Sequence, residues 1–190
     1  MSFAAENMVF CVGKMDKWRV EGALPGGHVS RPELQVAAIA LGSNLESDGR
    51  DRAANLREAV ARLGALGRVT AVSSFYDTVP VGYLEQPRFL NGAALLETEL
   101  EPVALLEGLL AVEQAMGRDR SGTVAKGPRV IDLDLLLFGA VVLETAELTV
   151  PHPAMRERRF VLEPLREIAP EMVDPVTGRT VAELWEMCRA

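Results

Sequence analysis

Two aspartates stand one residue apart within the strongest strand candidate of this 190-residue chain, Val130–Phe138. The alternation of a β-strand places Asp132 and Asp134 on one face and their apolar neighbours on the other. Carboxylates at that spacing, with Cα atoms roughly 6.5–7 Å apart, repel each other and are costly to bury. Mg²⁺ would relieve the conflict, because it prefers oxygen ligands, and two ions could hold a polyphosphate there. Salt bridges to arginines, or a solvated sheet face, are the alternatives.

Two clusters of basic residues stand out in a chain whose formal net charge is −7. Residues 118–129 carry four basic side chains and one acidic one, a net charge of +3, and they border the aspartate pair. Residues 156–166 carry four arginines and two glutamates, a net charge of +2. Such clusters suit an anionic ligand such as ATP, or else they form a solvated face. No Walker loop or G-x-G-x-x-G motif is present, so a nucleotide site would consist of side chains and metal.

A ring and an amide stand two residues apart where another strand is expected to begin. Phe89 and Asn91 therefore share one face of that strand. The asparagine amide offers a donor and an acceptor, which match the edge of a heterocyclic amide, and the ring could stack on it. A core phenylalanine and a turn-capping asparagine are the alternative. His152, between two prolines, is typical of a loop hydrogen bonder; beside phosphates it would act as a donor.

Hydrophobic periodicity predicts the elements that must position these residues. Strands are expected over 36–41, 69–76, 89–97 and 130–138. A first helix is expected from about Ala53 to Gly64, with Asp48 as a possible cap, and a second from Pro102 to Gly117. Residues 141–143 could form a hairpin with the last strand, and the tail from Arg156 adds one or two helices. This order is the ferredoxin-like split βαβ pattern of an α/β (α+β) protein, an antiparallel sheet with helices on one face.

Composition excludes several classes of protein. Hydrophobic residues make up 48% and charged residues 25%, as in a globular domain, and a pI near 5.0 with 5% aromatic residues argues against an RNA-binding module. No apolar run is long enough to span a membrane and no signal peptide is evident, so we expect a cytoplasmic protein without nucleic-acid or membrane partners. Two cysteines and two histidines nearly exclude a soft-metal cluster. We expect an N-terminal extension of unknown role over 1–35 and one catalytic domain over 36–190.

Five motifs, in order, resemble one family of enzymes. They lie over about residues 37–170, and the Gly-Pro-Arg-x-Ile-Asp-Leu-Asp block is the most specific of them. The motifs are Ala-Leu-Gly-Ser-Asn-Leu (40–45), Ser-Ser-Phe-Tyr-Asp-Thr (73–78), Gln-Pro-Arg-Phe-Leu-Asn (86–91), Gly-Pro-Arg-Val-Ile-Asp-Leu-Asp-Leu (127–135) and Leu-Thr-Val-Pro-His-Pro (148–153). Together they resemble the 6-hydroxymethyl-7,8-dihydropterin pyrophosphokinases of folate biosynthesis.

The resemblance implies a ferredoxin-like core and transfer of pyrophosphate from MgATP to the pterin hydroxymethyl group, with release of AMP. It implies two Mg²⁺ ions on Asp132 and Asp134, with Asp134 the better candidate to orient or deprotonate the hydroxyl. The catalytic set is expected to comprise these two aspartates, Arg118 and Arg129. The resemblance assigns the pterin to Thr78, Val81, Phe89, Asn91 and Phe160, and ATP to Glu113, Arg120, His152 and Arg158. We expect a monomer whose partners are these two small substrates.

Two rival interpretations stay open at this point. A non-catalytic regulatory module of the same topology would need no paired aspartates, and a degenerate relative could bind the pterin without turnover. Two departures from the family pattern bear on the second rival: Lys126 stands where a tryptophan is common, and Glu147 where an arginine is common. We expect the loop 118–128 to be mobile in the free protein, to order over both substrates, and to close more weakly because of Lys126.

Overall fold

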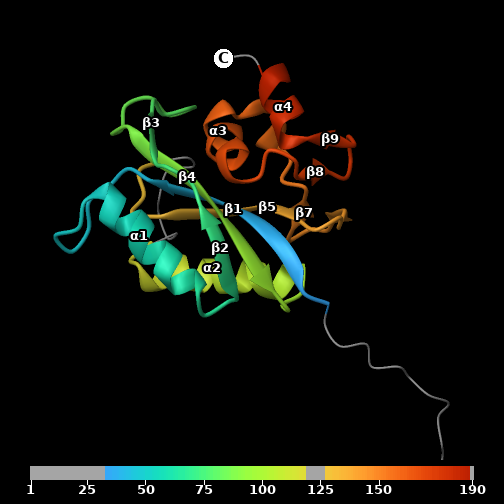
Figure 1. Cartoon of the computed structure of the whole chain (residues 1–190). Helices are drawn as coiled ribbons and strands as arrows, with labels where there is room; N and C mark the ends of the chain where they lie inside the picture. Colours follow the sequence, from blue (N-terminus) through green and yellow to red (C-terminus); the bar gives the residue numbers. More distant parts are fainter. Residues whose placement is uncertain (1–32, 119–126, 189–190) are drawn as a thin grey trace, which may run out of the picture. The chain divides into compact units, whose positions relative to one another are not determined.

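The computed structural model describes residues 33–118 and 127–188, and its centre is one antiparallel sheet (Figure 1). The sheet consists of β1 (Gln35–Ser43), β2 (Arg68–Val72), β3 (Tyr76–Thr78), β4 (Phe89–Thr98) and β5 (Asp132–Phe138). The strand order is β2-β4-β1-β5, and β3 pairs with β4 beyond the end of β2. This order, with a helix after β1 and another after β4, is that of the split βαβ pattern, so the predicted ferredoxin-like core is confirmed.

One face of the sheet is covered by α1 (Arg52–Leu63) and α2 (Pro102–Ala115) (Figure 1). The apolar positions of both helices recur at helical spacing and pack on alternate residues of the strands, among them Leu133 and Leu135 of β5. Each such buried aliphatic side chain stabilises the fold by about 1.5–3 kcal/mol. Because strand neighbours point in opposite directions, this packing directs Asp132 and Asp134 to the other face.

The other face is covered in part by the C-terminal elements, which the sequence placed only as a tail. Helices α3 (Arg159–Ile168) and α4 (Val181–Met187) pack on it through a second apolar cluster that includes Leu136 and Leu162. The prediction of helices on one face is therefore right for α1 and α2 and wrong for the tail. Three short elements complete this region: the 3-10 helix η1 (Met155–Glu157), β8 (Val173–Asp174) and β9 (Arg179–Thr180).

Three local predictions were wrong. The cap of α1 is Asp51, whose carboxylate accepts the Ala54 N–H at 2.7 Å, whereas Asp48 lies in the preceding turn with φ +51°. The expected strand 69–76 is split into β2 and β3, because the chain leaves the regular ladder after Val72. The expected hairpin of 141–143 with β5 does not form.

The physical reason for the missing hairpin lies at the end of β5. The Gly139 N–H donates to the Val36 carbonyl and so continues the pairing with β1, and a positive φ then turns the chain away. The next short strands, β6 (Leu143–Glu144) and β7 (Thr149–Val150), pair with each other. None of the helices in the described ranges is long and apolar enough to cross a membrane.

Candidate active site

A pocket of about 330 Å³ opens on the face of the sheet that carries the two aspartates. The ends of β1, β3, β4 and β5 form its floor, and the start of α3 forms one wall. Eleven of the thirteen predicted site residues line it: Thr78, Val81, Phe89, Asn91, Arg118, Arg129, Asp132, Asp134, His152, Arg158 and Phe160. Segments separated by up to 121 residues of chain, from Ala40 to Val161, thus converge on one space.

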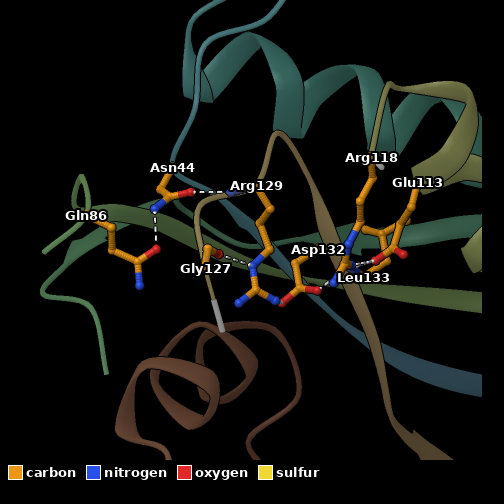
Figure 2. A network of polar contacts seen from close by, with 8 residues as sticks. All are labelled: Asn44, Gln86, Glu113, Arg118, Gly127, Arg129, Asp132 and Leu133. Atoms are coloured by element: carbon orange, nitrogen blue, oxygen red, sulfur yellow. Dashed lines mark hydrogen bonds and ion pairs between the residues drawn. The ribbon is translucent and has the colours of Figure 1, made fainter. Parts of the chain in front are cut away.

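The carboxylate of Asp132 lies between two arginines (Figure 2). Its Oδ1 accepts from Arg118 Nη1 at 2.5 Å and its Oδ2 from Arg129 Nη1 at 2.7 Å. All three side chains are 17–23% exposed, so a ligand that enters the pocket can reach them. The alternative of an arginine salt bridge, raised from the spacing alone, therefore describes this carboxylate.

Glu113 does not line the pocket. Its side chain is 1% exposed on α2, where Oε1 accepts the Leu133 N–H at 2.8 Å and pairs with the guanidinium of Arg118 (Figure 2). A carboxylate buried in this way ties Arg118 to the strand that carries both aspartates. The structure thus places Glu113 behind the site, where it can orient Arg118. Arg120 lies outside the described residues, as do Lys126 and most of the loop 118–128.

Asp134 has a different environment from Asp132. Burial, and then the negative charge of Asp132, raise the pKa of the Asp134 carboxyl above its ordinary value. Burial likewise lowers the pKa of the neighbouring His152, which favours the neutral ring. His152 Nδ1 accepts the Ala154 N–H at 3.2 Å, so in the neutral ring the hydrogen is on Nε2. This tautomer leaves His152 with a donor, as expected for a contact to phosphate.

The pocket residues on β3 and β4 are uncharged, although the guanidinium carbons of Arg129 and Arg158 lie 5.5 and 6.0 Å from the ring centroids of Phe89 and Phe160. Asn91 is buried, and its amide nitrogen donates to Thr78 Oγ1 at 2.6 Å, which leaves its carbonyl oxygen and second hydrogen for a ligand. Phe89 stands on the same strand two residues earlier, and Phe160 faces the pocket from α3. Gly42 leaves room beneath them, because a Cβ there would lie 3.2 Å from Asn91 Oδ1 and 3.8 Å from Phe89.

Asn44 is a structural contributor that sequence reasoning did not single out, although it stands in the first family motif. Its amide nitrogen donates to Gln86 Oε1 at 3.0 Å and to the Pro87 carbonyl at 3.1 Å, while its Oδ1 accepts the Arg129 N–H at 2.7 Å (Figure 2). One buried side chain thus joins the segment before β4 to the segment before β5. The partners lie 42, 43 and 85 residues from Asn44 in the sequence, so only the motif itself could have signalled this role.

The donor set at β5 suits a hard divalent cation. Two carboxylates face one half-buried space, and within the described residues no hydrogen bond or ion pair reaches the Asp134 carboxylate. Burial and the charge of Asp132 raise the pKa of Asp134 in spite of the nearby Arg158 and Arg129, and a cation bound there would favour the ionised carboxylate. No group of three or more acidic, histidine or cysteine side chains forms a complete cage within 33–118 and 127–188. A metal at this pair would take its remaining ligands from substrate and water, as Mg²⁺ commonly does.

A ferredoxin-like sheet with paired carboxylates, arginines and a neutral aromatic slot in one pocket defines a phosphoryl-type transferase acting on small molecules. Residues 38–170 match the model of one protein family, described as 7,8-dihydro-6-hydroxymethylpterin-pyrophosphokinase (HPPK). That span covers more than half of the chain. The chain therefore belongs to this family of pyrophosphokinases, as its motifs suggested.

Individual relatives agree with the family. The chain is 49% identical over 145 residues to the 2-amino-4-hydroxy-6-hydroxymethyldihydropteridine pyrophosphokinase of Bacillus subtilis (strain 168), covering 75% of this chain and 83% of the relative. It is 43% identical over 155 residues to the enzyme of the same name from Pseudomonas aeruginosa (strain PAO1), covering 82% and 93%. The fold is similar to that of a crystallised Plasmodium falciparum HPPK-DHPS, with a TM-score of 0.64 and 17% identity over 84% of this chain. This chain spans 45% of that longer protein.

Proposed function

We propose that this chain transfers pyrophosphate from MgATP to the hydroxymethyl group of 6-hydroxymethyl-7,8-dihydropterin, as a step of folate biosynthesis. The proposal rests on one observation. The two carboxylates of β5, Asp132 and Asp134, line the same pocket as the ring of Phe89 and the amide of Asn91 on β4. The first suits a metal–polyphosphate, and the second suits a flat heterocycle with amide edges. Family membership supports the same reaction.

In the proposed reaction the pterin hydroxyl oxygen bonds to the β-phosphorus of ATP, and the bond between that phosphorus and the α-phosphate oxygen breaks. AMP leaves, the hydroxyl proton is lost, and the pterin diphosphate is formed. Little covalent chemistry falls to the protein, so its contribution is to align the two substrates and to neutralise charge. Asp134, which lies in the less compensated position, is suited to orient the hydroxyl or take its proton.

Two Mg²⁺ ions shared by Asp132 and Asp134 would supply the main charge neutralisation for the phosphates. Such binding would compete with the contacts of Asp132 to Arg118 and Arg129, whose guanidinium groups would then be available to the phosphates. His152 and Arg158 line the same side and offer further donors. We expect the enzyme to act as a monomer in the cytoplasm, and the cysteine-poor sequence supports the reducing compartment.

On the neutral side, Phe89 and Phe160 would stack on the two faces of the pterin. Asn91 would form hydrogen bonds with its amide edge, and Thr78 and Val81 would line the slot. Buried amides of this kind select a ligand strongly, because a mismatched partner leaves a polar group unpaired.

The test is an assay with the full chain, ATP, Mg²⁺ and the pterin alcohol, in which AMP and the pterin diphosphate are measured together. Equimolar formation of both products supports the proposal. Pterin binding without AMP formation would instead identify a degenerate relative, and release of inorganic phosphate and ADP would contradict pyrophosphoryl transfer.

A further inference from the structure

A fully buried carboxylate lies outside the pocket, in the C-terminal region that the proposed chemistry does not use. The side chain of Asp174, on β8, has no solvent exposure. Its two oxygens accept from Arg156 in a fork, Nε to Oδ2 at 2.6 Å and Nη2 to Oδ1 at 3.0 Å. The Val176 N–H and the Thr177 hydroxyl add two more bonds, at 3.0 and 2.8 Å. A buried charge is tolerated only when it is paired and hydrogen-bonded this completely.

The Asp174 carboxyl is ionised at neutral pH. Burial by itself raises its pKa, but the hydrogen bonds from Arg156, Thr177 and Val176 outweigh burial and hold the pKa below the ordinary value. The same contact raises the pKa of Arg156. Both side chains of the pair are therefore charged at neutral pH. The Arg156 side chain is 28% exposed, and the Asp174 side chain is fully buried.

The arginine of this pair stands in the middle of a segment that ends in pocket residues. Arg156 belongs to η1, between His152 and Arg158, both of which line the pocket. The segment is joined to β5 at its start, where the His152 N–H donates to the Leu136 carbonyl at 2.8 Å. Neither η1 nor α3 has a side-chain hydrogen bond at its N-cap, and the local bond that closes η1 at Arg158 is a backbone one, from the Arg158 N–H to the Met155 carbonyl at 3.3 Å. Within the described residues, the only side-chain hydrogen bonds of Arg156 are those of its fork with Asp174.

We propose that Asp174 is a positioning residue: through Arg156 it holds the segment 152–158 so that His152 and Arg158 face the nucleotide phosphates. The inference rests on the proposed function, since it assigns these two side chains to ATP. A planar guanidinium bound in a fork restricts both distance and orientation, which a single hydrogen bond would not do. The C-terminal hairpin β8–β9 thus contributes to the site without touching it.

The experiment compares the binding of a non-hydrolysable MgATP analogue, by calorimetry, in the wild-type chain and three variants. Asp174→Asn removes the charge and cannot accept all four hydrogen bonds. Arg156→Lys keeps the charge but loses the fork, and it serves as the milder variant should Asp174→Asn fail to fold. The matched control is Glu167→Gln, which breaks hydrogen bonds from Ser74 and Tyr76 at the other end of α3.

The dissociation constant of the analogue is expected to rise about tenfold in Asp174→Asn and about threefold in Arg156→Lys, because misplaced phosphate ligands bind weakly. Glu167→Gln is expected to stay within about twofold of the wild type even where its melting temperature falls. Unchanged nucleotide affinity in both Asp174→Asn and Arg156→Lys would overturn the inference. An equal loss in Glu167→Gln would also overturn it, because it would show a general loosening of α3.

The two proposals fail in different ways. A wild-type chain that binds the analogue but forms no AMP from ATP and the pterin would contradict the proposed reaction, while the comparison of nucleotide affinities among the variants would still decide the role of Asp174.

Discussion

The two sides of the pocket have opposite chemistry, one on β5 and the other on β4, the two strands that flank β1 in the sheet. On the β5 side, carboxylates and guanidinium groups face one another. On the β4 side, a buried amide and aromatic rings present fixed, uncharged contacts. One side is therefore suited to a charged, metal-dependent substrate and the other to a neutral, shape-dependent one, and the two should respond differently to substitution and to salt.

The largest effect is expected from removing the metal-binding charge. Asp134→Ala or Asp132→Ala should lower turnover at least about a thousandfold, because the metal loses a ligand where charge develops. Chelation of Mg²⁺ should have the same effect on the wild type. The measurement is AMP formation under saturating substrates, with Glu97→Gln, a surface carboxylate paired with Arg68, as the control that should keep full activity. A near-normal rate in either aspartate variant would refute the metal role.

The neutral side should respond to loss of its amide. Asn91→Ala is expected to weaken pterin binding about tenfold to a hundredfold, because an unpaired ring amide in a dry pocket costs about 1–3 kcal/mol. Binding of the MgATP analogue should change little. Calorimetry with each ligand tests this directly, and an equal loss for both ligands would show that Asn91 supports the whole pocket rather than the pterin alone.

A smaller steric effect is expected at the floor of the slot. Gly42→Ala introduces a Cβ about 3.2 Å from Asn91 Oδ1, closer than most real contacts of this kind. Because Asn91 must yield slightly, pterin affinity should fall by roughly fivefold while the fold and the ATP affinity are kept. Pterin titration and thermal melting distinguish this outcome from a general loss of stability, which would lower both.

Ionic strength should separate the two sides in the unmodified protein. Raising the salt concentration from about 0.05 to 0.5 M shortens the Debye length severalfold, so binding of the MgATP analogue should weaken by about twofold to fivefold. Pterin binding should be almost insensitive. Parallel salt dependence for the two ligands would contradict the division of the pocket into a charged and a neutral side.

The smallest effect concerns stability without metal. Since burial and Asp132 raise the pKa of Asp134, its ionised form opposes folding, and the wild type should lose stability as the pH rises from about 4 through that raised pKa. Asp134→Asn removes this loss, so in chelator it should be slightly more stable than the wild type at pH 7. The advantage should vanish near pH 4. Denaturant melts at both pH values measure it, and an equally large gain at pH 4 would contradict the cause.

Much of the site followed from local periodicity. The period-two pattern correctly placed Asp132 and Asp134 on one face of β5, and Phe89 and Asn91 on one face of β4. The same pattern predicted that Leu133 would pack in the core. These inferences succeeded because the direction of a side chain along a strand depends only on its place in that strand.

Other features depended on contacts between distant segments. Strand β2 ends at Val72 where its regular pairing with β4 ends, and the chain turns at Gly139 after a last hydrogen bond to β1. Neither position can be predicted from one segment alone, because each depends on the strand beside it. The cap of α1 is a different case, because it is local: Asp51, which directly precedes the first turn, accepts the Ala54 N–H, whereas the sequence pattern suggested Asp48.

By itself the sequence determined the class of fold, the family and the identity of the residues that could do the chemistry, because motifs and periodicity are local properties of the chain. Only the tertiary structure distinguished the two aspartates, since Asp132 forms ion pairs with Arg118 and Arg129, while at Asp134 burial and the like charge of Asp132 outweigh the more distant positive charges. Only it buried Glu113 behind the pocket and Asn44 between two loops. Burial and charge compensation are sums over everything that surrounds a side chain, and those surroundings exist only after the chain has folded.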